Sequence, residues 1–126
     1  MGSFKVTVEV ADLQGQGRLT VEALVDTGAT YTLLPAFLLR ELGIAPHDQR
    51  QFVLADGSEI ERDVGHAWIR IDGRSALNFV VFGDEEAEPL LGVVTLESLS
   101  LGVDPVNHRL IPVRARLQSL VCSRPV

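Results

Sequence analysis

Apolar and polar residues alternate with a period of two along the first part of the chain. Residues 4–10 place Phe or Val at every second position between charged and polar residues, and residues 19–25 repeat this alternation. A period of two indicates a strand with one buried face. Residues 13–17 lie between the two runs and contain two glycines, which favour a tight turn. The pattern therefore predicts an N-terminal β-hairpin.

A short helix is predicted after these strands. Residues 31–34 form an apolar run, Pro35 follows it, and Leu38 and Leu42 stand four positions apart in the segment 36–42. Proline is favoured in the first turn of a helix and glycine just after the last turn. We therefore expect a helix over residues 36–42 that ends at Gly43.

The middle of the chain predicts two more hairpins. Residues 51–54 and 58–72 have the composition of strands and are separated by Ala55-Asp56-Gly57. Asp72-Gly73 then leads to a third strand at residues 75–82. An Asp-Gly pair between two strands is a strong hairpin signal, so both pairs are expected at turns.

The last third of the chain begins with the short apolar segment Leu90-Leu91-Gly92. Thr95 is expected to cap a helix over residues 96–101 that ends at Gly102, because Thr favours helix starts and Gly favours helix ends. Residues 111–117 alternate again and predict a final strand. The whole pattern predicts one mostly-β domain over residues 1–126, a small barrel or sandwich.

Charge and hydropathy restrict the partners of this domain. The formal net charge is -6, which argues against nucleic-acid binding because that binding depends on neutralising phosphates. The longest apolar runs, such as residues 77–82, are far shorter than the ~20 residues that cross a bilayer. Residues 1–10 also lack the apolar centre of a signal peptide. We therefore expect a cytoplasmic protein with neither a membrane nor a nucleic-acid partner.

Histidine and cysteine do not predict a metal centre. His47, His66 and His108 are widely spaced without a metal-ligand pattern, and each is expected on a surface or in a turn. Cys122 is the one cysteine, so no intrachain disulfide can form, and we expect a small, partly buried side chain there. Trp68 lies on a predicted strand, where it either faces a dimer or substrate surface or covers a sheet.

One carboxylate lies in an apolar setting. Asp26 directly follows the apolar segment 23–25, Gly28 permits a sharp turn, and a second apolar run begins at Tyr31. Burying a carboxylate is costly unless it is paired or has a chemical task. Asp also stabilises its own turns through side-chain hydrogen bonds. On composition alone, Asp26 is therefore either a structural turn residue or a functional acid.

The segment Asp26-Thr27-Gly28-Ala29 resembles the Asp-Thr/Ser-Gly-Ala signature of retropepsins and other aspartic proteases. Asp56-Gly57 stands where that family has its flap hairpin. Leu90-Leu91-Gly92 stands where the family has paired apolar residues and a glycine before its C-terminal helix. The likeness covers nearly the whole chain and is greatest to small bacterial and archaeal members. It implies an all-β fold, a closed β-barrel of the acid-protease type with one or two short helices.

The resemblance implies an aspartic endopeptidase that needs no metal and no organic cofactor. Because the chain contains one Asp-Thr-Gly, a homodimer is expected, in which two Asp26 carboxylates hydrolyse a peptide or protein substrate. By the same resemblance, Thr27 would bond across the interface, Gly28 would line the peptide site, and Ala29 would pack beneath the strand ends. The segment Leu90, Leu91 and Gly92 would support the active loop, and Ala55, Asp56 and Gly57 would form the flap.

Two features depart from the retroviral pattern. Thr30 stands where retroviral enzymes usually carry an aspartate, and the predicted flap is short and polar rather than glycine-rich and apolar. Two alternatives stay open. The first alternative to an endopeptidase is a catalytically silent member of the fold that serves as a dimerisation or peptide-binding module. The second is an unrelated β-sandwich in which Asp26 is structural.

Overall fold

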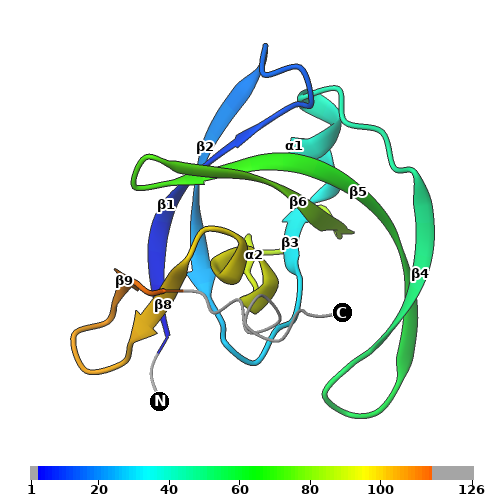
Figure 1. Ribbon diagram of the computed structural model, residues 1–126. Coiled ribbons are helices and arrows are strands. Elements are labelled where there is room, and N and C mark those ends of the chain that lie inside the picture. The colour runs from blue at the N-terminus through cyan, green and yellow to red at the C-terminus, as the bar shows by residue number, and fades with distance from the viewer. Residues whose placement is uncertain (1–2, 115–126) are drawn as a thin grey trace, which may run out of the picture.

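The computed structural model describes residues 3–114, which form a mostly-β fold with two short helices (Figure 1). The helices are α1 (Ala36–Glu41) and α2 (Val93–Ser98). The strands are β1 (Phe4–Ala11), β2 (Arg18–Val25), β3 (Thr32–Pro35), β4 (Asp48–Val53), β5 (Glu59–Ile71), β6 (Arg74–Gly83), β7 (Leu90–Leu91), β8 (Leu101–Asp104) and β9 (Arg109–Pro112). Neither helix is long and apolar enough to span a membrane, within the residues described.

One sheet carries most of the structure, in the strand order β1-β2-β7-β3-β6-β5-β4. An additional antiparallel pairing joins β1 to β5, so the strand pairings run in a ring from β1 back to β1. Strand β4 lies outside this ring and pairs with β5, forming the long hairpin that extends from the rest of the sheet in Figure 1. Strands β8 and β9 form a separate hairpin.

The alternation along the sequence corresponds to one buried and one exposed face of each strand. In β5, Ala67, Ile69 and Ile71 are buried, whereas Trp68 and Arg70 between them are exposed. The buried side chains of the sheet meet those of both helices in one core, which includes Val8, Val10, Ala23, Val25, Leu34, Leu39, Val80, Leu91, Leu96 and Leu99. The predicted period of two is therefore confirmed, and burial of this apolar area favours the fold.

Helix α1 forms where the sequence predicts it. Pro35 precedes it in an extended conformation, with φ -56° and ψ 138°. Proline has no N–H, but a residue at the start of a helix makes no intrahelical N–H bond, so none is lost. Gly43 follows the helix with φ 76°, and its N–H donates to the carbonyl of Arg40. Leu39 is completely buried, so the helix is held by packing of its apolar face.

Helix α2 corrects the prediction for residues 96–101. The helix begins at Val93 with Gly92 as its N-cap, and the Leu96 N–H donates to the Gly92 carbonyl. Thr95 is therefore not a cap but a buried residue inside the helix. The helix ends at Ser98, and Gly102 lies in β8. The error arose because the Thr95 hydroxyl bonds another buried hydroxyl instead of a helix-terminal N–H.

The C-terminal strand also differs from its prediction. Strand β9 begins at Arg109, two residues before the predicted start at Ile111, because Arg109 pairs with Asp104 of β8. Residues 115–117 of the predicted strand, and Cys122, lie outside the described residues.

Candidate active site

Asp26 directly follows β2 and is held in a tight turn by its own backbone and side chain. Its N–H donates to the carbonyl of Leu91, and its carbonyl accepts the N–H of Ala29 at 3.0 Å. Its carboxylate Oδ1 accepts the N–H of Gly28 at 2.9 Å. The side chain therefore has the turn-stabilising bond expected of a structural aspartate. Asp26 is nevertheless only half-buried, with Thr27 and Gly28 exposed beside it, so the carboxylate can be reached from outside.

Two hydrogen bonds tie the Asp26 loop (residues 26–30) to the start of α2. The N–H of Val93 donates to the carbonyl of Ala29 at 2.9 Å, and the N–H of Val94 donates to the carbonyl of Thr30 at 3.0 Å. The first N–H groups of a helix have no partner within the helix, so the loop satisfies two of them. Helix α2 thereby fixes the loop through its backbone.

Gly92 lies directly against the backbone of Thr30 and Tyr31, at the end of the Asp26 loop. A Cβ atom at this position would come within 2.5 Å of the Tyr31 carbonyl carbon and 2.7 Å of the Thr30 carbonyl oxygen. Both are backbone atoms, which cannot rotate away as a side chain can. Only glycine therefore permits this approach between the segment after β7 and the Asp26 loop.

A buried pair of hydroxyls beneath the loop was not anticipated from the sequence. Thr32 Oγ1 lies 2.6 Å from Thr95 Oγ1 and accepts the N–H of Gly92 at 3.0 Å. Their residues are 1% and 0% exposed. Buried polar groups need such partners, so this network stabilises one arrangement of β3, Gly92 and α2. The available signal was a threonine within the apolar run 31–34.

A pocket of about 280 Å³ lies between the Asp26 loop and the β4–β5 hairpin. It is lined by Gly28, Ala29, Thr30, Tyr31, Leu33, Phe52, Val53, Leu54, Ile60, Arg62, Val81 and Leu90. The structure thus brings Gly28, Ala29 and Leu90 together with both arms of the hairpin. Asp26 and Thr27 line a second hollow, with Phe4 and Val103 among its other residues. The hairpin tip, Ala55 to Gly57, lines neither of these two hollows.

The predicted turn at Ala55-Asp56-Gly57 is present at the tip of the β4–β5 hairpin. Leu54 and Ser58 close it through a backbone bond of 2.8 Å, and Gly57 has φ 87°. The Asp56 carboxylate accepts the hydroxyl and the N–H of Ser58, and these bonds lower the pKa of Asp56 below its ordinary value. The tip is exposed and polar, and its role as a flap stays a prediction.

His47 and His66 form a contact that their sequence spacing did not indicate. His47 Nε2 lies 3.0 Å from His66 Nδ1, because pairing of β4 with β5 brings the two together. The pKa of His66 is lowered below its ordinary value of 6.5. Burial is the largest cause, followed by the neighbouring His47 and then by the Arg50 guanidinium. Within residues 3–114, no three His, Cys, Asp or Glu side chains are grouped to hold a metal ion.

Comparisons with known proteins show the family and the fold of the chain. The model of the gag-polyprotein putative aspartyl protease family matches residues 11–98, which include the Asp26 loop and Gly92. A search of curated proteins finds no match. The family match covers more than half of the chain and contains the Asp26-Thr27-Gly28-Ala29, Asp56-Gly57 and Leu90-Leu91-Gly92 segments.

Solved structures show the same fold. The protease of simian foamy virus (mac) is 21% identical with a TM-score of 0.51, over 73% of this chain and 92% of that one. The EIAV protease is 18% identical with a TM-score of 0.55, over 78% and 88%. A retropepsin-like aspartic protease from Rickettsia conorii is 20% identical with a TM-score of 0.54, over 82% and 77%. The retropepsin-like fold is therefore confirmed, and the chain belongs to the gag-polyprotein putative aspartyl protease family.

Proposed function

We propose that this chain is an aspartic endopeptidase whose active unit is a homodimer with one Asp26 from each subunit. The observation that carries the proposal is that Asp26, a half-buried residue, stands in a turn fixed by Leu91, Ala29 and α2. Each chain has one Asp-Thr-Gly, so the second carboxylate must come from a second copy. A two-fold axis close to Asp26 would place the two carboxylates face to face.

The proposed reaction is water attack on a peptide carbonyl. Two carboxylates at short range hold one proton between them because both cannot ionise readily, as is known for the aspartate pair of aspartic proteases. The ionised Asp26 takes a proton from the attacking water, while the protonated Asp26 donates a hydrogen bond to the carbonyl oxygen. This division of labour requires the pair to retain one proton, so we expect the highest activity on the acid side of neutral pH.

The pocket between the Asp26 loop and the β4–β5 hairpin supports a peptide as the substrate. Its lining is mainly apolar and includes Tyr31, Leu33 and Phe52, which suit an apolar side chain. Gly28 at its edge has no side chain to keep a peptide backbone away. In the proposal the hairpin tip, Ala55 to Gly57, is the flap that covers the bound peptide.

The same proposal includes the remaining parts of the family architecture. The ring of strand pairings, which joins β1, β2, β7, β3, β6 and β5, supports the closed acid-protease β-barrel that the sequence predicted. The proposal also keeps residues 1–126 as one domain. Thr27 is exposed next to Asp26, where it can contact a second subunit. Leu90, Leu91 and Gly92 support the Asp26 loop from beneath.

A digest of a peptide library tests the proposal with a matched pair of variants. Asp26→Asn keeps the shape of the turn but removes the base, and should lower the hydrolysis rate by about 10²–10⁴-fold. Asp72→Asn makes the same change in an exposed Asp-Gly turn and should leave the rate unchanged, since Asn also tolerates the positive φ of Asp72. Unimpaired cleavage by folded Asp26→Asn would refute the assignment. A wild-type chain that dimerises and binds peptides without cleaving them would favour the silent module.

A further inference from the structure

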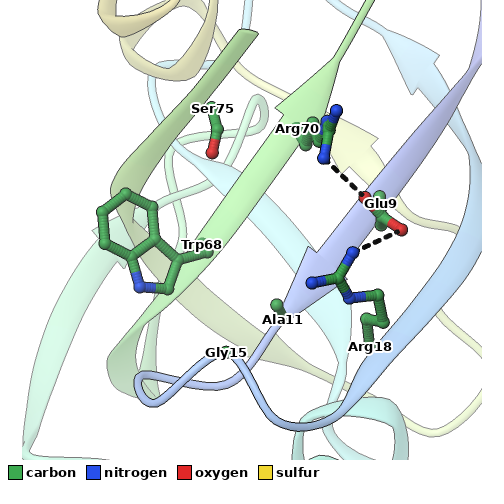
Figure 2. A pocket seen from close by; sticks show the side chains of 7 residues that line it. All are labelled: Glu9, Ala11, Gly15, Arg18, Trp68, Arg70 and Ser75. Carbon is green, nitrogen blue, oxygen red and sulfur yellow. Dashed lines mark ion pairs between the residues drawn. The ribbon is translucent and has the colours of Figure 1, made fainter. Parts of the chain in front are cut away.

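A further pocket, of about 250 Å³, lies on the outer face of the sheet where β1 pairs with β5. We call it the Trp68 pocket; it is lined by Glu9, Ala11, Gly15, Arg18, Trp68, Arg70 and Ser75. In Figure 2 the Trp68 ring stands on one side, the two guanidinium groups stand on the other, and Ala11 lies between them. Ala11 has a small side chain and Gly15 has none, which leaves the space that separates the ring from the cations.

The Trp68 pocket is remote from the Asp26 loop. Arg18 begins β2 and Val25 ends it, and seven steps of about 3.3 Å separate the two by roughly 23 Å. Figure 1 accordingly shows the turn between β1 and β2 at the opposite end of the hairpin from the loop between β2 and β3. The pocket is thus a separate surface feature and not part of the proposed peptide groove.

The pocket carries excess positive charge on an acidic protein. Glu9 is the one carboxylate among its residues, and it is shared by Arg18 at 3.6 Å and Arg70 at 4.0 Å. The arginine side chains are 55% and 53% exposed. Exposed ion pairs of this length are weak, so each guanidinium can turn to another carboxylate without a large loss. Arginine also binds carboxylates through two parallel hydrogen bonds, which makes the pair a suitable anion receptor.

Trp68 supplies a rigid apolar wall beside these cations. Its Nε1–H donates to the carbonyl of Leu13 at 3.2 Å, which fixes the ring, yet the residue remains 37% exposed. Leu77, which pairs with Trp68 across β5 and β6, is 46% exposed, and Leu13 is 52% exposed. Tryptophan and arginine are among the residue types that contribute most of the binding energy at protein–protein interfaces. An exposed tryptophan near two arginines is therefore suited to bind a protein.

We propose that the Trp68 pocket binds an extended acidic segment of a partner protein, with a carboxylate on Arg18 and Arg70 and an apolar side chain against Trp68. Trp68 and Arg70 are two positions apart on one strand face, about 6.6 Å. An extended peptide presents its own residues i and i+2 at the same spacing, so an apolar residue two positions from Glu or Asp fits both groups. Net charge of -6 and a single pair of arginines disfavour nucleic acid as the occupant. The proposal does not depend on hydrolysis at Asp26.

Trp68 is the one tryptophan of the chain, so its fluorescence reports on the pocket directly. The Asp26→Asn chain, which keeps the probe uncut, is titrated with the blocked heptapeptide Gly-Ser-Leu-Ser-Glu-Ser-Gly. We expect a saturable change in emission below about 1 mM peptide, which weakens as salt rises from about 50 to about 300 mM. The peptide with Gln in place of Glu should bind at least about tenfold more weakly.

Variants assign the binding to the pocket. Combined Arg18→Gln and Arg70→Gln should weaken binding of the Glu peptide at least about tenfold. Arg109→Gln removes another exposed arginine, paired with Asp104, and should leave binding unchanged. Equal binding of the Glu and Gln peptides, or no loss in the Arg18/Arg70 variant, would overturn the proposal. So would displacement of the peptide by inorganic phosphate at equal ionic strength, since the pocket would then be a simple anion site.

Discussion

Replacing Gly92 by alanine should displace the Asp26 loop and destabilise the fold. The new Cβ would lie 2.5 Å from the carbonyl carbon of Tyr31 and 2.7 Å from the carbonyl oxygen of Thr30, so backbone must move. Overpacking of this kind costs about 1–3 kcal/mol. The movement also strains the bonds from Val93 to Ala29 and from Val94 to Thr30, each contributing about 1 kcal/mol. The free energy of unfolding should therefore fall by about 3–5 kcal/mol.

Thermal unfolding and peptide hydrolysis measure the two consequences of this change. For a domain of this size, we expect Tm to fall by about 10–20 °C. In the chains that remain folded, a displacement of the loop by about 1 Å should lower kcat/KM by about 10²-fold. Gly17→Ala is the matched control, because its Cβ would meet only Leu42 at an ordinary 3.5 Å. Wild-type Tm and activity in Gly92→Ala would refute the close approach on which the site depends.

Three further changes test other parts of the structure. Thr32→Val leaves the Gly92 N–H and the Thr95 hydroxyl without their buried partner, so the free energy of unfolding measured in urea should fall by about 2–3 kcal/mol. A variant as stable as the wild type would contradict the hydrogen-bond network. The pKa of His66 is lower in the folded than in the unfolded chain, so the unfolded chain binds more protons and the free energy of unfolding should fall as pH drops below 6.5. His66→Asn should make this fall smaller, and the same pH dependence in the variant and the wild type would contradict the reasoning. Amide exchange at residues 54–60 should slow when a peptide inhibitor binds, whereas unchanged exchange would leave the turn without a flap role.

The sequence predicted those parts of the fold that local patterns specify. The alternation along residues 4–10 and 19–25 corresponds to β1 and β2, because one face of each strand is buried. The Asp-Gly pairs at residues 56–57 and 72–73 lie at hairpin turns, where both glycines and Asp72 have positive φ. On composition alone Asp26 was either a structural turn residue or a functional acid, and the resemblance of Asp26-Thr27-Gly28-Ala29 to the retropepsin signature made it the candidate catalytic residue.

Contacts between distant parts of the chain could not be read from local patterns. Thr32 and Thr95 meet across 63 residues because β3 lies beside the segment that opens α2. Sequence reasoning therefore assigned Thr95 to a helix cap and placed α2 three residues too late. His47 and His66, 19 residues apart, meet through the pairing of β4 with β5. The Trp68 pocket likewise requires β1 to pair with β5, which no local pattern indicates.

Mixing wild-type and Asp26→Asn chains tests the proposed pair of Asp26 carboxylates in a homodimer most directly. After free exchange at equal amounts, about a quarter of the dimers have two aspartates and about half are mixed. Mixed dimers have one base position occupied by an amide, so activity per wild-type chain should fall to about half, and dilution should lower it further as dimers dissociate. Undiminished activity on mixing, from a species that sediments as a monomer, would contradict a site built from two copies of Asp26.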